Sequence, residues 1–190
     1  MNLVKIAHLL WTQHLKPGMT VIDATAGNGY DTLFLAKQVL SDSNGHVHAF
    51  DIQKEAIEST AALLKKNLPP FQLDHLTLHH ASHEFFPIGL KNIDLIAYNL
   101  GYRPAGNKKI TTIAPITIKS CQSALDILAP HGLLSIMIYP GHPQGSLEKE
   151  SLYNWLNSLS SKKLYISIHT PFNRPNAPIL LIISKLDNHK

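Results

Sequence analysis

The segment from residue 21 to residue 36, VIDATAGNGYDTLFLA, constrains the fold of this chain more than any other. A short apolar run leads into two closely spaced glycines, and an apolar pattern with helical spacing follows them. This order predicts a buried strand, a tight turn and a helix, which together form the nucleotide-binding corner of a doubly wound α/β domain. Two acids, Asp23 and Asp31, flank the glycines, and the turn carries no basic residue. We therefore expect a cationic ligand such as S-adenosylmethionine here, rather than a diphosphate.

Strands and helices alternate along most of the chain, which predicts a parallel sheet with helices on its faces. The last two strands are joined by a loop without a helix, so we expect an antiparallel hairpin at one sheet edge. These patterns predict a single α/β domain over residues 1–190, with a seven-stranded, mostly parallel Rossmann-like sheet. The expected strands are 20–24, 46–50, 76–79, 94–99, 133–139, 164–168 and 179–184. The expected helices are 3–15, 31–40, 54–66, 115–128 and 147–159.

The composition fits a globular domain, with 44% hydrophobic and 16% charged residues, and it argues against disorder. A formal net charge of +4 permits an RNA partner but does not demand one. Cys121 is the single cysteine, which excludes a disulfide within the chain and indicates a reducing compartment. The sequence shows neither a signal-peptide pattern nor an apolar run of membrane-spanning length. We therefore expect a cytoplasmic protein that does not contact membranes.

Ligands of such sheets bind beyond the carboxyl ends of the strands, so the residues at these ends are the candidates. At the first strand, Gly27 and Gly29 let the backbone pass close to a ligand, and Thr32 stands where a pyrophosphate fingerprint has a third glycine. Asp51 follows the second strand, 51 − 29 = 22 positions after Gly29, and its carboxylate suits ribose hydroxyls. Its alternative role is to cap the next helix. Gln53 is a second candidate for the ribose.

Two later strand ends complete the expected pocket. After the third strand, Ser82 and His83 fall where an adenine ring would bind, with capping of the turn as the alternative. A metal site is not expected at residues 79–83, because their histidines lack a carboxylate or cysteine cluster at ligand spacing. After the fourth strand, the side-chain oxygen of Asn99 suits the N–H groups of an amine, and Tyr102 suits stacking on a base.

Basic and polar residues lie where a larger substrate would approach. The segment 103–109 carries three basic residues that suit phosphate groups, with a solvated loop as the alternative. Tyr139 and His142 follow the fifth strand in a turn with two prolines and two glycines, and they are candidates for orienting the acceptor or taking its proton. The segment 173–176 is expected at the same mouth. Substrate contacts are thus expected from Arg103, Lys108, Lys109, Asn173 and Arg174.

Four blocks together resemble one family: DATAGNGYDTLFLA (23–36), YNLGYRPAG (98–106), YPGHPQG (139–145) and NRPNAP (173–178). The chain resembles the small class I methyltransferases labelled putative rRNA methylases, a family that includes the bacterial tRNA 5-aminomethyl-2-thiouridine methyltransferase. The second block is similar to the Asn-Pro-Pro-Tyr turn of amino-methyltransferases, with Leu100-Gly101 in place of the prolines. The resemblance implies methyl transfer from S-adenosylmethionine to the aminomethyl nitrogen of the wobble uridine in the tRNA anticodon stem-loop. It also implies a homodimer.

The resemblance and the strand ends together give the expected site. Cofactor contacts are expected from Asp23, Ala26, Gly27, Asn28, Gly29, Asp31, Thr32, Asp51, Gln53, Ser82 and His83. Catalytic roles are expected from Asn99, Tyr102, Tyr139 and His142. Methylation of rRNA remains an alternative, as do an NAD-linked oxidoreductase and an RNA-binding module without catalysis. The acid at Asp31 and the missing third glycine argue against the oxidoreductase, and the cofactor corner argues against the binding module.

Overall fold

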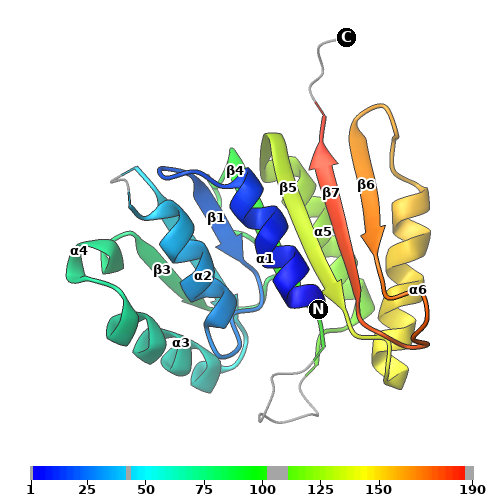
Figure 1. The fold of residues 1–190 in the computed structure, drawn as a ribbon, viewed down its shortest axis with the longest axis horizontal. Coiled ribbons are helices and arrows are strands. Elements are labelled where there is room, and N and C mark those ends of the chain that lie inside the picture. The colour runs from blue at the N-terminus through cyan, green and yellow to red at the C-terminus, as the bar shows by residue number, and fades with distance from the viewer. Residues whose placement is uncertain (1, 42–43, 102–110, 187–190) are drawn as a thin grey trace.

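The computed structural model describes residues 2–41, 44–101 and 111–186, and Figure 1 shows its ribbon. Within these residues, seven strands form one sheet in the order β3-β2-β1-β4-β5-β7-β6. Neighbouring strands pair in parallel except for β7, which is antiparallel to both β5 and β6. The predicted mostly parallel sheet with an antiparallel hairpin at one edge is confirmed. The strands are β1 (Thr20–Asp23), β2 (His46–Asp51), β3 (Leu76–His80), β4 (Ile93–Asn99), β5 (Leu128–Ile138), β6 (Leu164–His169) and β7 (Ile179–Lys185).

Helices cover both faces of the sheet (Figure 1). Helices α1, α2 and α3 pack on one face, and α5 and α6 pack on the other. Successive residues of the central strands point to opposite layers: Val21 packs with the first group of helices and Ile22 with the second. Burial on both faces accounts for the apolar runs of these strands. The helices of the described residues are α1 (Leu3–His14), α2 (Tyr30–Val39), α3 (Lys54–Asn67), α4 (Pro70–Leu73), α5 (Ala114–Ile127) and α6 (Pro143–Asn157).

Three elements differ from the sequence prediction. Helix α6 begins at Pro143 rather than at residue 147, because His142 is its N-cap and accepts the N–H of Gly145 through Nδ1 at 3.1 Å. Histidine is not among the usual N-cap residues, so the sequence did not indicate this start. Strand β5 follows α5 without a loop, since Leu128 already pairs with Ile93. The one-turn helix α4 was not expected.

The carboxyl ends of β1, β2, β4 and β5 meet at one edge of the sheet, the lower edge in Figure 1. Polar residues end three of these strands, namely Asp23, Asp51 and Asn99, and Tyr139 follows the fourth. This edge is therefore where the fold gathers the candidate site. No helix in the described part of the chain is both long and apolar enough to cross a membrane.

Candidate functional site

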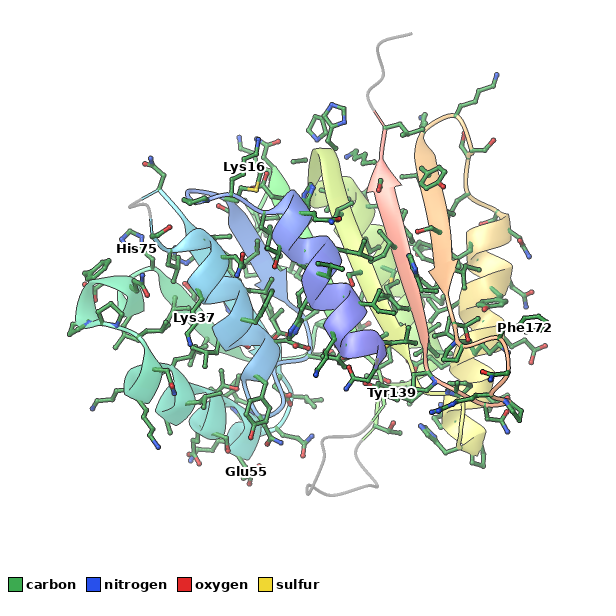
Figure 2. The ribbon with its side chains drawn as sticks, in the orientation of Figure 1. Lys16, Lys37, Glu55, His75, Tyr139 and Phe172 are labelled. Carbon is green, nitrogen blue, oxygen red and sulfur yellow. The ribbon has the colours of Figure 1, made fainter. Side chains whose placement is uncertain are left out.

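A cavity of about 630 Å³ opens at this edge of the sheet, a size typical of small-molecule sites. Its wall is formed by the segments that follow the first five strands, together with the start of α5. Figure 2 shows Tyr139 at this edge, and Lys16 and His75 at the opposite edge. The predicted site residues that line the cavity are Ala26, Gly27, Asn28, Asp31, Asp51, Gln53, Ser82, His83, Asn99, Tyr139 and His142.

The two glycines after β1 have different roles. Gly27 lines the cavity with a φ of +55° and donates its N–H to Asp51 Oδ2 at 2.9 Å. A Cβ there would meet only the carbonyl oxygen of Thr25, at 3.8 Å, so conformation rather than space favours glycine. Gly29 does not line the cavity; its φ is +82°, and a Cβ would lie 2.8 Å from the Cα of Thr60. The prediction that Gly29 contacts the cofactor is thus corrected: it lets α2 approach α3.

Asp23 and Thr32 were also expected to contact the cofactor, and they too lie behind the cavity wall. Both are buried, at 2% and 0% exposure. Thr32 Oγ1 donates to Asp23 Oδ2 at 2.6 Å, and the backbone N–H of Thr25 donates to Asp23 Oδ1 at 3.1 Å. The pair therefore ties the end of β1 to the first turn of α2, because the Thr32 side chain points back toward the strand instead of outward to a ligand.

The buried carboxyl of Asp23 makes stability depend on pH. Burial raises its pKa from 3.8 to about 7, and repulsion from Asp31 adds to this effect. The folded state thus binds more protons than the unfolded chain between these values, and stability falls as pH rises through that window. We expect wild type to lose about 2–3 kcal/mol of unfolding free energy from this group between pH 5 and pH 8. Asp23→Asn, whose amide can keep both partners, should not show this loss. Urea unfolding at both pH values measures this difference, and equal pH dependence in the two proteins would contradict it.

Asp51 presents its carboxylate to the cavity while the backbone holds it in place. Oδ2 accepts the N–H of Gly27 and Oδ1 accepts the N–H of Gln53, each at 2.9 Å. A carboxylate has about four lone-pair sites, so two remain for the hydroxyls of a ribose. The alternative role of Asp51 as a helix cap holds in part, because its carboxylate accepts the N–H of Gln53, which is the N-cap residue of α3. The side chain of Asp51 therefore orders both the glycine turn and the entry to that helix.

The segment after β3 lines the cavity with Ser82 and His83, and one polar atom in it is unpaired. His83 Nδ1 is buried and has no hydrogen-bond partner among the described residues. Burial lowers the pKa of this imidazole to about 4, so the ring is neutral at pH 7. Ile52 and Ile113 line the same cavity although they are 61% and 41% exposed. A neutral ring nitrogen and two isoleucine side chains in one cavity fit a flat heteroaromatic ligand, and with Asp51 these residues fit the adenosine half of S-adenosylmethionine.

Asp31 and Asn99, both predicted site residues, meet at the cavity wall, and a third residue joins them. The Nδ2 group of Asn99 donates to Asp31 Oδ2. The amide oxygen of Asn99 is therefore available to accept a hydrogen bond from a ligand. The other carboxylate oxygen, Asp31 Oδ1, lies 2.6 Å from His8 Nε2. The backbone N–H of Asn99 donates to Thr25 Oγ1 at 2.6 Å, which fixes the strand end. His8 was not predicted, because its sequence neighbourhood gives no sign of the contact.

Tyr139 and His142 line the cavity beside Gly101. A Cβ on Gly101 would lie 3.9 Å from His142 Nε2 and 4.0 Å from Tyr139 Cδ2. Burial raises the pKa of the Tyr139 phenol, and the nearby carboxylate of Asp31 raises it further. The phenol therefore stays protonated at neutral pH and can donate a hydrogen bond. It can orient the acceptor but is not suited to take its proton.

Glu148 lies behind this wall and was also missed. It is 1% exposed and accepts hydrogen bonds from Thr112 Oγ1 at 2.9 Å and Thr117 Oγ1 at 2.5 Å. Thr112 Oγ1 in turn accepts the N–H of Gly101, and the Thr112 N–H donates to the Gly101 carbonyl. Burial raises the pKa of Glu148. The acid thus supports the cavity wall through a threonine 36 residues away in sequence.

The charge of the cavity is negative. Among the described lining residues there are two carboxylates, Asp31 and Asp51, and no lysine or arginine. This agrees with the expectation of a cationic ligand. No group of three or more histidine, cysteine, aspartate or glutamate side chains in the described ranges is placed to hold a metal ion.

The predicted substrate-contact residues that the structure describes do not line the cavity. Asn173 and Arg174 are exposed and do not line it. Their segment does approach the turn after β5, since the carbonyl oxygen of Asn176 lies 3.8 Å from the position of a Cβ on Gly141. The predictions for Tyr102, Arg103, Lys108 and Lys109 fall outside the described residues.

Comparison with known sequences gives related methyltransferases. Residues 47–185 match the model of a family described as "Putative rRNA methylase". An Arabidopsis thaliana protein named "tRNA (mnm(5)s(2)U34)-methyltransferase, chloroplastic" is 39% identical over 191 residues, covering 97% of this chain and 69% of that protein. Ribosomal RNA small subunit methyltransferase H of Acinetobacter baumannii is 35% identical over 80 residues, covering 42% of this chain and only 25% of that protein.

Solved structures agree with this result. A Clostridium thermocellum protein described as a "putative rRNA-methylase" superposes with a TM-score of 0.89 and 33% identity over 98% of each chain. A Streptococcus mutans protein described as a "putative methyltransferase" and solved in complex with SAH has a TM-score of 0.81 and 28% identity, with 96% of this chain and 97% of that chain covered.

Proposed function

This chain belongs to the "Putative rRNA methylase" family, and we propose that it methylates the aminomethyl nitrogen of 5-aminomethyl-2-thiouridine at the wobble position of tRNA. The coarser assignment is plain: the protein is an S-adenosylmethionine-dependent RNA methyltransferase. The finer one, the wobble nucleoside, rests on the site and on the relative from Arabidopsis thaliana, whose name specifies that nucleoside.

The observation that carries the choice of acceptor is the pair of side chains at the cavity wall, Asp31 and Asn99. Together they offer carboxylate and amide oxygens, which accept the N–H groups of an alkylamine and offset its positive charge. A neutral acceptor atom of a base ring has no positive charge for the carboxylate to offset. Since Asp31 lies in the same cavity as Asp51, the amine and the adenosine would share one site.

The residues of the chain divide the work of binding and orientation. Asp51 and Gln53 would hold the ribose, Ser82 and His83 the adenine, and the turn at Ala26, Gly27 and Asn28 the amino-acid end of the methyl donor. When bound, S-adenosylmethionine supplies a methyl group on a sulfonium that is a good leaving group. The protein's main contribution is then to hold the amine nitrogen in line with that methyl group, through Asn99 with Tyr139 and His142 beside it.

Methylation of rRNA is the second candidate, and one observation favours it. The matched rRNA methyltransferases are named for the small ribosomal subunit. Their similarity covers less than half of this chain, whereas the similarity to the Arabidopsis protein extends over almost all of it. The tRNA substrate is therefore the first proposal.

One labelling experiment separates the two candidates. The pure protein is mixed with methyl-labelled S-adenosylmethionine and with separate tRNA and rRNA pools from cells that lack the wobble methylation, and the labelled nucleosides are identified by mass spectrometry. We expect label in tRNA alone, on the aminomethyl group of the 2-thiouridine. An anticodon stem-loop with unmodified uridine at the wobble position serves as the control and should accept no methyl group. Label in an rRNA nucleoside, or on a ring atom, would contradict the proposal.

The remaining partner predictions stand as proposals. They are a homodimer, a cytoplasmic location and recognition of the anticodon stem-loop by the basic residues predicted to contact the substrate. The net charge of +4 agrees with an RNA partner.

A further inference from the structure

The contact between His8 and Asp31 joins helix α1 to the wall of the cavity. The Nε2–Oδ1 distance is 2.6 Å, and the two side chains are 24% and 12% exposed. The His8 ring stacks on Phe34 of α2, with centroids 3.9 Å apart and planes 14° apart, and it also contacts Trp11 at 5.1 Å. Asp31 lines the cavity while His8 does not. The imidazole is thus held behind the carboxylate, with part of its surface in solvent.

We propose that the Asp31–His8 pair takes the proton from the acceptor amine before methyl transfer, an inference that rests on the proposed function. An alkylamine is largely protonated at neutral pH and has no free electron pair until one proton leaves. The amine nitrogen gives that proton to Asp31 and its partner imidazole, whose joint charge changes from −1 to 0. The freed electron pair forms the N–CH₃ bond, and the S–CH₃ bond breaks with its electrons remaining on sulfur. The pair then releases its proton to water through the exposed part of His8.

Other groups at the cavity are less suited to this task. Both oxygens of Asp51 are held by backbone N–H groups, which cannot pass a proton on to solvent. Both oxygens of Asp31 are also in hydrogen bonds, but one of these is with the partly exposed imidazole of His8. His142 uses Nδ1 to cap α6, and the phenol of Tyr139 remains protonated. The imidazole of His8 can both accept and release a proton, and its Nε2 lies 2.6 Å from Asp31 Oδ1.

Three groups face Asp31 from neighbouring strand ends. Asp23 and Tyr139 face Asp31 closely enough to interact with its charge, Asp23 from the end of β1 and Tyr139 from the end of β5. Asn99 donates to Asp31 from β4. The side chains in ring contact with His8, Phe34 and Trp11, are uncharged.

The test compares two matched histidine-to-glutamine variants of helix α1. His8→Gln can still donate an amide N–H to Asp31 but cannot take up a proton. His14→Gln is the control, since His14 Nε2 lies 3.0 Å from the Asp94 carbonyl oxygen and the residue does not line the cavity. Each variant is assayed for single-turnover methyl transfer to a 5-aminomethyl-2-thiouridine stem-loop across pH. S-adenosylmethionine affinity is measured separately by calorimetry.

We expect His8→Gln to lower the single-turnover rate by about 10- to 100-fold with unchanged S-adenosylmethionine affinity, and to move the acid limb of the pH–rate profile to lower pH. His14→Gln should match wild type. A His8→Gln rate and profile equal to wild type would overturn the inference and leave the proposed function intact. The inference would also be overturned if His8→Gln lowered the affinity for S-adenosylmethionine in proportion to the rate, because His8 would then only support the cavity wall. If the wild-type protein transfers no methyl group to this stem-loop but labels another RNA, the proposed function fails, and this inference fails with it.

Discussion

Replacing Asp51 by alanine should abolish measurable binding of S-adenosylmethionine. The carboxylate accepts the N–H groups of Gly27 and Gln53, and its remaining lone pairs are the expected partners of the two ribose hydroxyls. Two hydrogen bonds to a charged group contribute about 3–6 kcal/mol, which corresponds to a loss of affinity of about 10²- to 10⁴-fold. Isothermal titration calorimetry of the variant with S-adenosylmethionine measures this loss.

The control for this variant is Asp74→Ala, which removes an exposed aspartate beside α4 that does not line the cavity. It should bind the methyl donor as wild type does. Because Asp51 also orders the glycine turn, thermal unfolding without ligand is measured in parallel to show that the variant is folded. Unchanged affinity in folded Asp51→Ala would remove Asp51 from the cofactor site.

Replacing Asn99 by alanine should leave the affinity for S-adenosylmethionine unchanged and lower the rate of methyl transfer. The side chain contacts Asp31 and leaves its amide oxygen to the acceptor, whereas its backbone N–H, bonded to Thr25, is unaffected by the change. Loss of the group that orients the amine should lower the single-turnover rate by about 10²-fold. The assay uses the aminomethyl stem-loop at saturating S-adenosylmethionine, with affinity determined by calorimetry.

Asn67→Ala is the matched control for Asn99. Its amide donates to the carbonyl of Leu63 at the exposed end of α3. Asn67 does not line the cavity and is far in sequence from every residue that does. It should leave both affinity and rate unchanged. A normal transfer rate in Asn99→Ala would show that the acceptor amine is oriented by other groups.

The predicted cofactor residues that reach the cavity share a simple property. Asp51 ends β2, and Gly27 and His83 lie within four residues of the ends of β1 and β3. Residues at the carboxyl ends of parallel strands come to the same edge of the sheet whatever the helices do. The error at Thr32 has a different origin, because the direction of a helix side chain depends on how the helix rotates against the sheet. Thr32 lies in the first turn of α2 but points back to Asp23.

The residues that sequence reasoning missed are tied to partners far along the chain. His8 lies 23 positions from Asp31, and Glu148 lies 36 positions from Thr112. Neither His8 nor Glu148 belongs to a motif, and no spacing rule links a helix residue to a partner on another segment that it meets only after folding. Their contacts depend on where α1 and α6 pack.

The mostly parallel sheet with its antiparallel hairpin, the edge of the sheet that carries the ligand and the acidic character of the glycine turn were readable from the amino-acid order, because each depends on local pattern and on the fixed geometry of parallel strands. The proton-accepting partner of Asp31, the support of the cavity wall by Glu148 and the inward rotation of Thr32 arose from packing between distant segments. Such packing depends on the whole set of buried contacts, and a linear pattern of residues does not record it.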